Sequence, residues 1–179
     1  MAMKDKDIIL AMKDRPDEGF RLLMAAYKEP VYWHIRRLVV VHADAQDATQ
    51  EAFVRIFRSF GRFGGSGSLA AWIYRIATNE ALRILDRCRK NRPSLGDAAA
   101  AVGTMTADTY VDYSDLETIR LQNAILTLPP KQQIAFNLRY YDELDYEEIA
   151  AVTGSTVSAA KANYHIAKDK IIRYMNSHD

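Results

Sequence analysis

Apolar residues recur at intervals of three and four along the first half of the chain, which is the spacing of amphipathic helices. The first such stretch covers residues 18–41 and is expected to be interrupted near Pro30, because the residue before a proline disfavours helical backbone. A second helix is predicted from about Asp44 to Phe60. Its predicted inward face comprises Ala48, Ala52, Phe53, Ile56 and Phe57. A third helix is predicted to start after Ser68, a favoured N-cap residue, and to end near the basic run at 87–90.

Two segments lack this periodicity. Residues 61–68, GRFGGSGS, are too rich in glycine to remain helical, so they are predicted to form a flexible loop. Residues 93–114 are rich in Ala, Gly, Thr and Asp, which is the composition of a linker, although an alanine-rich helical turn inside them is compatible with it.

The last third is predicted to contain four helices. The first two run from Leu116 to Leu126 and from Pro130, a favoured first helical residue, to about Tyr140. Asp145 with Glu148 resembles a capping box, Gly154 ends a short helix, and Thr156 caps a longer one. The small and apolar residues that allow the last two helices to cross closely are Ile149, Ala150, Val157, Ala160 and Tyr164. Two helices joined by a tight glycine turn predict a helix-turn-helix.

The predicted fold is therefore all-α: two small helical bundles joined by a flexible linker, the second containing the helix-turn-helix. The domain boundaries are placed at 1–92, 93–114 for the acidic linker, and 115–179.

Composition excludes several classes of function. No apolar stretch approaches the roughly 20 residues that cross a bilayer, and the charged N-terminus lacks a secretion signal, so we expect a cytoplasmic protein without membrane insertion. The chain has one cysteine, Cys88, and four scattered histidines. We therefore expect no metal, no cofactor and no redox chemistry.

The formal net charge of +1 conceals an uneven distribution. Residues 1–92 carry 17 Lys and Arg against 11 Asp and Glu, residues 93–118 carry none against 5, and residues 119–179 carry 7 against 7. A basic first half favours a polyanionic partner, although such an excess alone is equally compatible with an ordinary solvated surface.

The second helix of a helix-turn-helix enters the DNA major groove. Lys161 and His165 lie four residues apart on one face of it, and Ser158 in the first turn is placed to reach a phosphate. The alternative is a helical hairpin with solvated lysines. Five acidic residues between 142 and 148 would repel phosphate, so they are expected to point away from DNA.

Aromatic and arginine side chains alternate between residues 63 and 92, a mixture that suits unpaired DNA. For Trp72, at a helical core spacing, packing is the favoured interpretation over base stacking. The polar stripe of Arg75, Asn79 and Arg83 at four-residue spacing is harder to explain by packing.

Three stretches in this order resemble the extracytoplasmic-function (ECF) group of sigma factors: DAQDATQEAFVRIF, RFGGSGSLAAWIYRIATNEALR and LPPKQQIAFNLRYYDELDYEEIAAVTGSTVSAAKANYHIAKDKI. The resemblance covers nearly all of both predicted domains. It implies a non-enzymatic factor that binds core RNA polymerase and directs promoter recognition, strand opening and transcription initiation.

The resemblance also implies roles for individual residues. Core-polymerase binding is assigned to Asp47, Gln50, Glu51, Phe53 and Arg55. Capture of the single-stranded −10 element is assigned to Phe63, Gly64, Gly65, Ser66, Ser68, Trp72, Arg75, Asn79 and Arg83. Recognition of the double-stranded −35 element is assigned to Thr156, Ser158, Lys161, Ala162, Asn163, His165, Ile166 and Lys168. Asn163 and Ile166 stand where the family often has arginine, and Ala159 where it often has threonine, so the −35 sequence read is expected to differ.

By the same resemblance, the acidic linker threads toward the RNA exit path, and an anti-sigma factor wedges between the two domains. Two other functions are considered. A stand-alone helix-turn-helix regulator predicts tight duplex binding without polymerase. A nucleic-acid-processing enzyme is disfavoured, because no paired carboxylates, nucleophile arrangement or phosphate-binding glycine motif occurs at usable spacing.

Overall fold

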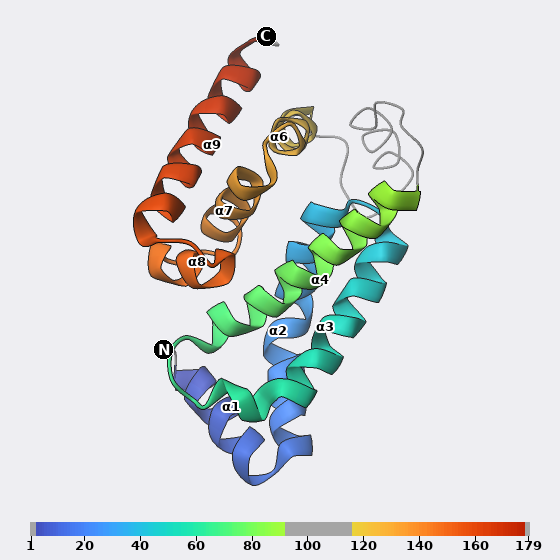
Figure 1. Cartoon of the computed structure of the whole chain (residues 1–179), viewed down its shortest axis with the longest axis vertical. Coiled ribbons are helices and arrows are strands. Elements are labelled where there is room, and N and C mark those ends of the chain that lie inside the picture. Colours follow the sequence, from blue (N-terminus) through green and yellow to red (C-terminus); the bar gives the residue numbers. More distant parts are fainter. Residues whose placement is uncertain (1–2, 92–115, 178–179) are drawn as a thin grey trace.

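The structure, a computed structural model, describes residues 3–91 and 116–177, and every regular element in these ranges is a helix. The first bundle comprises α1 (Met3–Asp14), α2 (Pro16–Val39), α3 (His42–Phe63) and α4 (Leu69–Asn91). The second comprises α6 (Leu116–Leu126), α7 (Pro130–Tyr140), α8 (Tyr146–Thr153) and α9 (Val157–Ser177). In Figure 1, α2, α3 and α4 pack against one another, and α9 packs on α6, α7 and α8. The all-α prediction is confirmed; the predicted linker at 93–114, with its alanine-rich turn, lies outside the described residues.

Helix α2 runs without a break through Pro30, so the predicted interruption there is wrong. Pro30 is exposed, and it removes only its own N–H from the helix while its ring strains the preceding turn. Leu23, Val31 and Ile35 are fully buried on either side of it. Each contributes about 1.5–3 kcal/mol by burial, which together exceeds the roughly 3 kcal/mol that an interior proline costs.

Helix α3 extends to Phe63, so the predicted loop is shorter than expected and Gly61 is helical. Phe60 and Phe63, three residues apart, are both buried, and this burial holds the last turn together. Gly64 then ends the helix with φ 67°, a left-handed conformation that glycine adopts without a steric penalty. Phe57 was expected to face inward but is 42% exposed, with its ring edge-on to Phe20 at 5.0 Å.

The predicted caps of the second bundle are confirmed. Asp145 accepts a hydrogen bond from the Glu148 N–H (2.8 Å), and the Glu148 carboxylate accepts one from the Asp145 N–H (3.0 Å), which completes a capping box. Gly154, with φ 63°, ends α8. Thr156 Oγ1 accepts from the Ala159 N–H at 3.1 Å and starts α9. Helices α8 and α9 thus form a helix-turn-helix.

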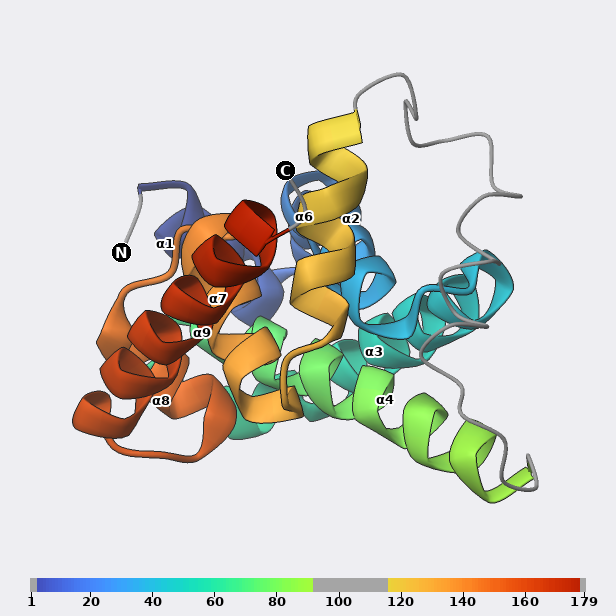
Figure 2. The same ribbon diagram turned by 90° about the horizontal axis from the view of Figure 1, so that it is seen from above.

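Two apolar cores hold the described residues together. The smaller core lies within the second bundle and comprises Ala124, Ile125, Leu128, Phe136, Ala167 and Ile171. The larger core runs through α1 to α4 and continues into α7, α8 and Ala160 of α9. Figure 1 shows α8 against the N-terminal part of α4, and Figure 2 shows the second bundle beside the first from above. The two bundles are therefore in direct apolar contact.

Candidate nucleic-acid interface

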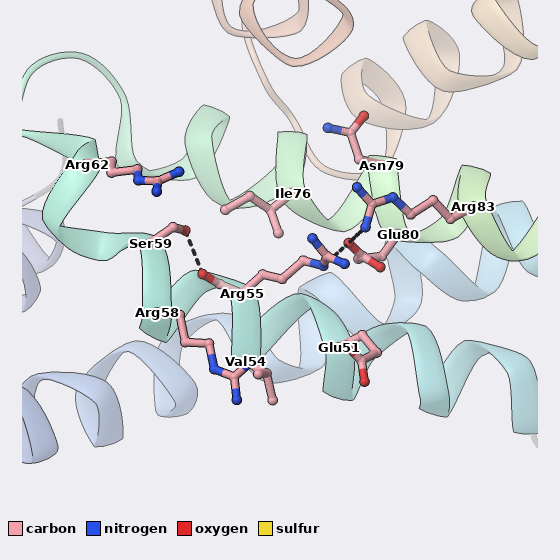
Figure 3. A pocket seen from close by; sticks show the side chains of 10 residues that line it. All are labelled: Glu51, Val54, Arg55, Arg58, Ser59, Arg62, Ile76, Asn79, Glu80 and Arg83. Atoms are coloured by element: carbon pink, nitrogen blue, oxygen red, sulfur yellow. Dashed lines mark hydrogen bonds and ion pairs between the residues drawn. The ribbon is translucent and has the colours of Figure 1, made fainter.

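A hollow of about 430 Å³, the groove between α3 and α4, lies on the surface of the first bundle (Figure 3). Its lining residues are Glu51, Val54, Arg55, Arg58, Ser59, Arg62, Ile76, Asn79, Glu80 and Arg83. Within it, the guanidinium groups of Arg55 and Arg83 converge on the buried carboxylate of Glu80, at 2.5 Å and 3.1 Å. Arg58 and Arg62 form no ion pair with any described residue. The hollow therefore keeps an excess of positive charge suited to phosphate groups.

Sequence reasoning counted Arg62 among the arginines interleaved with aromatic residues near the glycine-rich segment, but it did not single out Arg58. Arg55, Arg58 and Arg62 follow one another at spacings of three and four, so they share one face of α3. That spacing is the signal that identifies them. Asn79 and Arg83, which were predicted, line the same hollow from α4, whereas the exposed Arg75 lies on α4 outside this set of lining residues.

The glycine-rich segment connects α3 to α4 beside this groove. Gly64, Gly65 and Gly67 all have positive φ, and Gly64, Ser66 and Gly67 are exposed. Ser68 caps α4, because its Oγ accepts from the Ala71 N–H at 3.1 Å. The same Oγ donates to Glu148 Oε1 of the second bundle at 2.5 Å.

The aromatic residues predicted to hold bases lie mostly in the core. Phe63 is buried at the end of α3, not in the loop, and its ring lies 5.2 Å from that of Trp72. Trp72 is partly buried and also contacts Phe60 at 6.0 Å. Packing, the favoured interpretation for Trp72, accounts for these contacts.

The residues predicted to bind core polymerase differ in their exposure and in their contacts. Asp47, Gln50 and Glu51 are exposed on α3 and are free to meet a partner. Phe53 is 5% exposed and belongs to the larger core, so the structure does not present its ring at the surface. Arg55 is half exposed and is held by Glu80.

A second hollow, of about 520 Å³, adjoins Gln50 between α2 and α3. Its lining residues are Lys28, Tyr32, Trp33, His42, Gln46, Thr49 and Gln50. Tyr32 Oη and His42 Nδ1 are hydrogen-bonded at 2.7 Å, which fixes the two rings at its wall.

The helix-turn-helix presents most of its predicted DNA-reading residues to solvent. Thr156, Ser158, Lys161, Ala162, His165, Ile166 and Lys168 are exposed, and Asn163 is partly exposed. Ala150 and Ala160 are buried where α8 and α9 cross, as predicted. Val157, which was expected to pack at that crossing, is instead 41% exposed.

Two of the five acidic residues of segment 142–148, Asp142 and Glu148, point toward the first bundle. Asp142 accepts hydrogen bonds or ion pairs from His34 Nδ1 (2.9 Å), Arg37 (3.4 Å) and Tyr74 (3.3 Å). Its side chain is 4% exposed, and that of His34 is 0% exposed. Thr78 hydrogen-bonds the other nitrogen of His34 at 2.8 Å. Burial, and next the charge of Asp142, raises the pKa of Tyr74 well above its usual range.

Among the described residues, no group of three or more His, Cys, Asp or Glu is placed to hold a metal ion. None of the described helices combines the length and apolarity that crossing a membrane requires.

Two protein-family models match the chain. Sigma-70 region 2 matches residues 23–93, and Sigma-70 region 4 matches residues 118–171. These two ranges contain the groove between α3 and α4 and the helix-turn-helix.

Curated relatives match over almost the whole chain. The ECF RNA polymerase sigma factor SigW of Bacillus subtilis is 28% identical, with 96% of both chains covered. The ECF RNA polymerase sigma-E factor of Escherichia coli is also 28% identical, covering 94% of this chain and 93% of that one.

Solved structures share the fold. CnrH in complex with the cytosolic domain of CnrY matches with a TM-score of 0.75 at 17% identity, covering 98% of this chain and 99% of that one. The sigma factor RpoE in complex with the anti-sigma factor NepR from Bartonella quintana matches with a TM-score of 0.68 at 18% identity, covering 89% and 98%.

Proposed function

The chain belongs to the ECF group of sigma-70 factors, and we propose how its surfaces divide the recognition of a promoter. As such a factor it binds RNA polymerase, directs it to promoters and supports transcription initiation; sigma factors are non-enzymatic subunits. The boundaries we propose are a region 2 domain at 1–92, a linker at 93–114 and a region 4 domain at 115–179.

We propose that the groove between α3 and α4 holds the unpaired strand of the −10 element. The observation that carries this assignment is the pair Arg58 and Arg62, whose charges are not neutralised by any described residue, in one hollow with Asn79 and Arg83. A single strand is bound by positive charge along its phosphates together with contacts to its bases. The glycine-rich loop at residues 64–67, with Gly64, Ser66 and Gly67 exposed, lies next to the groove and is the proposed pocket for a flipped base.

Two other exposed surfaces are proposed to bind duplex DNA and the polymerase. The exposed face of α9 from Ser158 to Lys168 is proposed to read the −35 duplex. Asp47, Gln50 and Glu51 are proposed to dock on the polymerase, because exposed carboxylate and amide groups on a basic bundle can pair with arginines of a partner helix.

The test is holoenzyme reconstituted from core polymerase and the purified chain. Sequencing of the genomic DNA that it binds supplies the promoters. The double variant Arg58→Ala/Arg62→Ala is expected to co-elute with core like wild type but to lose about tenfold or more of open-complex formation, detected by permanganate reactivity of unpaired thymines.

A matched control removes two exposed charges elsewhere in the first bundle, Lys6→Ala/Arg21→Ala, and is expected to initiate normally. Equal defects in both double variants would refute the groove assignment. Failure of the wild-type chain to co-elute with core, or to initiate on any promoter of its source genome, would refute the function itself.

Two further proposals rest on the family. The related structures contain anti-sigma factors, so we propose that this chain also has an anti-sigma partner that inserts between its domains. Because its proposed partner polymerase acts in the cytoplasm, we propose that this chain acts there too. A stand-alone regulator would instead leave a footprint on promoter DNA without polymerase.

A further inference from the structure

One buried carboxylate joins the two walls of the groove between α3 and α4. Glu80 lies on α4, and its side chain is 8% exposed. Its Oε1 forms ion pairs with Arg55 Nε of α3 at 2.5 Å and with Arg83 Nη1 of α4 at 3.1 Å (Figure 3). Glu51, the other acidic residue of the lining, is exposed and forms no ion pair with a described residue. Glu80 is therefore the acidic group that restrains arginines in this groove.

The two arginines depend on Glu80 for their orientation. The side chains of Arg55 and Arg83 are 47% and 56% exposed, so both guanidinium groups reach solvent while they contact the buried carboxylate. A carboxylate taken out of water needs cationic partners, and here two guanidinium groups share one oxygen. Without that carboxylate both groups can turn toward another anion, because exposed side chains change rotamer rapidly. Glu80 therefore decides whether these two charges are held within the protein or are offered to a ligand.

The charge balance of the groove depends on this restraint. The lining contains four arginines and two glutamates, and Arg58 and Arg62 are the arginines of this set without an ion pair to a described residue. Contacts to phosphate supply affinity that does not depend on sequence. Each neutralised phosphate of a single strand adds about 0.7 to the magnitude of the slope of log K against log salt. Release of Arg55 and Arg83 would raise this sequence-independent part of the affinity.

Stronger attraction to phosphate has a kinetic consequence. A factor that directs initiation must hold the unpaired strand during opening and must then let it go. Among variants of one interface, tighter binding appears mainly as slower dissociation. A strand attracted by four unrestrained arginines would therefore be released more slowly than a strand attracted by two.

We infer that Glu80 is a positioning residue that holds Arg55 and Arg83 back from the DNA phosphates and thereby limits how long the groove retains the unpaired strand. The effect on DNA rests on the proposed function, because that function places the strand in this groove. The restraint of the two arginines is a property of the chain itself.

The test compares holoenzymes reconstituted from core polymerase with the wild-type or the variant chain. Glu80→Gln keeps the shape of the side chain and removes its charge. Binding to a fluorescent single-stranded oligonucleotide of scrambled sequence is expected to tighten about fivefold. The magnitude of the salt slope is expected to rise by about 0.7 for each guanidinium that reaches a phosphate. Open complexes challenged with heparin are expected to last about fivefold longer.

Two control variants separate the restraint from a general change of charge. Asp86→Asn removes an equal charge from an exposed position of α4 that does not line the groove, and it is expected to leave the salt slope and the lifetime unchanged. Glu80→Asp keeps the carboxylate and is expected to restore the wild-type slope. A variant that fails to fold cannot bind DNA more tightly, so the expected gain is not produced by loss of structure.

A double-mutant cycle identifies the arginine that is released. Arg83→Gln in the Glu80→Gln background is expected to lower the magnitude of the salt slope by about 0.7, because it removes a freed charge. In the wild-type background the same substitution is expected to lower it by less than half as much, because Glu80 already restrains that guanidinium. This second comparison does not require the Glu80→Gln chain to fold.

The outcomes distinguish this inference from the proposed function. An unchanged or smaller salt slope in Glu80→Gln, or an equal effect of Arg83→Gln in both backgrounds, overturns the inference even if the holoenzyme initiates normally. A steeper slope in Glu80→Gln, together with normal open-complex formation by Arg58→Ala/Arg62→Ala, supports the restraint by Glu80 and overturns the assignment of the −10 strand to the groove.

Discussion

The imidazole of His34 and the carboxylate of Asp142 lie 2.9 Å apart, although 108 positions separate them in the sequence. Both side chains are almost completely shielded from water. Removing one of the two side chains leaves the other buried without its hydrogen-bond partner. The resulting loss in the free energy of unfolding is far larger than that from removing a surface ion pair.

A double-mutant cycle measures this relationship. His34→Ala and Asp142→Ala are each expected to lower the free energy of unfolding by about 3 kcal/mol, and the double variant by less than their sum, giving a coupling energy of about 1–3 kcal/mol. Urea unfolding followed by circular dichroism supplies the four values. The exposed pair Arg15 and Glu18, 2.6 Å apart, is the control, with an expected coupling below about 0.5 kcal/mol. Equal coupling energies in the two cycles would contradict the prediction.

Stability is expected to fall in alkali. Burial, followed by a hydrogen bond to Asp5, raises the pKa of Tyr27, and burial likewise raises that of Tyr74. Above pH of about 10 the unfolded chain loses these protons while the folded chain keeps them, so the free energy of unfolding decreases as pH rises. Unfolding curves at increasing pH check this for wild type and for Tyr27→Phe with Tyr74→Phe. An equally steep decline without the two hydroxyls would rule out this cause.

Backbone strain at Glu143 can be relieved. Its φ of 56° places a residue with a side chain in the left-handed region, just before the α8 capping box. Glu143→Gly is expected to raise the free energy of unfolding by about 0.5–1 kcal/mol, measured with urea. Gly154→Ala, at φ 63°, is the reverse experiment and should lower it by about 1 kcal/mol. A loss of stability in Glu143→Gly would show that contacts of the Glu143 side chain matter more than its backbone.

The assignment of α9 to duplex DNA predicts a salt effect. Lys161→Ala in reconstituted holoenzyme is expected to weaken promoter binding and to reduce the slope of log K against log salt by about one. Lys6→Ala, an exposed lysine on α1, is the charge-matched control and should leave the slope unchanged. Binding measured by fluorescence anisotropy over a salt series distinguishes the two; identical slopes would remove Lys161 from the interface.

Local signals in the sequence predicted both ends of α8 and the start of α9 accurately, because each of these boundaries is fixed by a neighbouring side chain or glycine. Asp145, Glu148, Gly154 and Thr156 act within three or four residues of one another, so their roles are readable without the fold. Pro30 and Gly61 misled the prediction for the opposite reason. At both places, packing of distant residues overrides a local preference against helix.

The docking of the bundles could not be predicted in the same way. Asp142 was expected only to point away from DNA, and its partners His34 and Tyr74 lie in another part of the chain. Phe53 and Phe63 belonged to motifs with an expected surface role, yet both are core residues. Spacing gives the face of a helix on which a residue lies, but not which neighbour covers that face.

The Glu148 carboxylate makes one hydrogen bond within α8 and one to the first bundle. One oxygen closes the first turn of α8 through the Asp145 N–H, and the other accepts from Ser68 of the first bundle. The stability of that first turn of α8 therefore depends on whether the Ser68 hydroxyl is hydrogen-bonded to Glu148. The backbone amides at the start of α8 become natural reporters of domain separation: their hydrogen–deuterium exchange should accelerate whenever the chain opens, without any label attached.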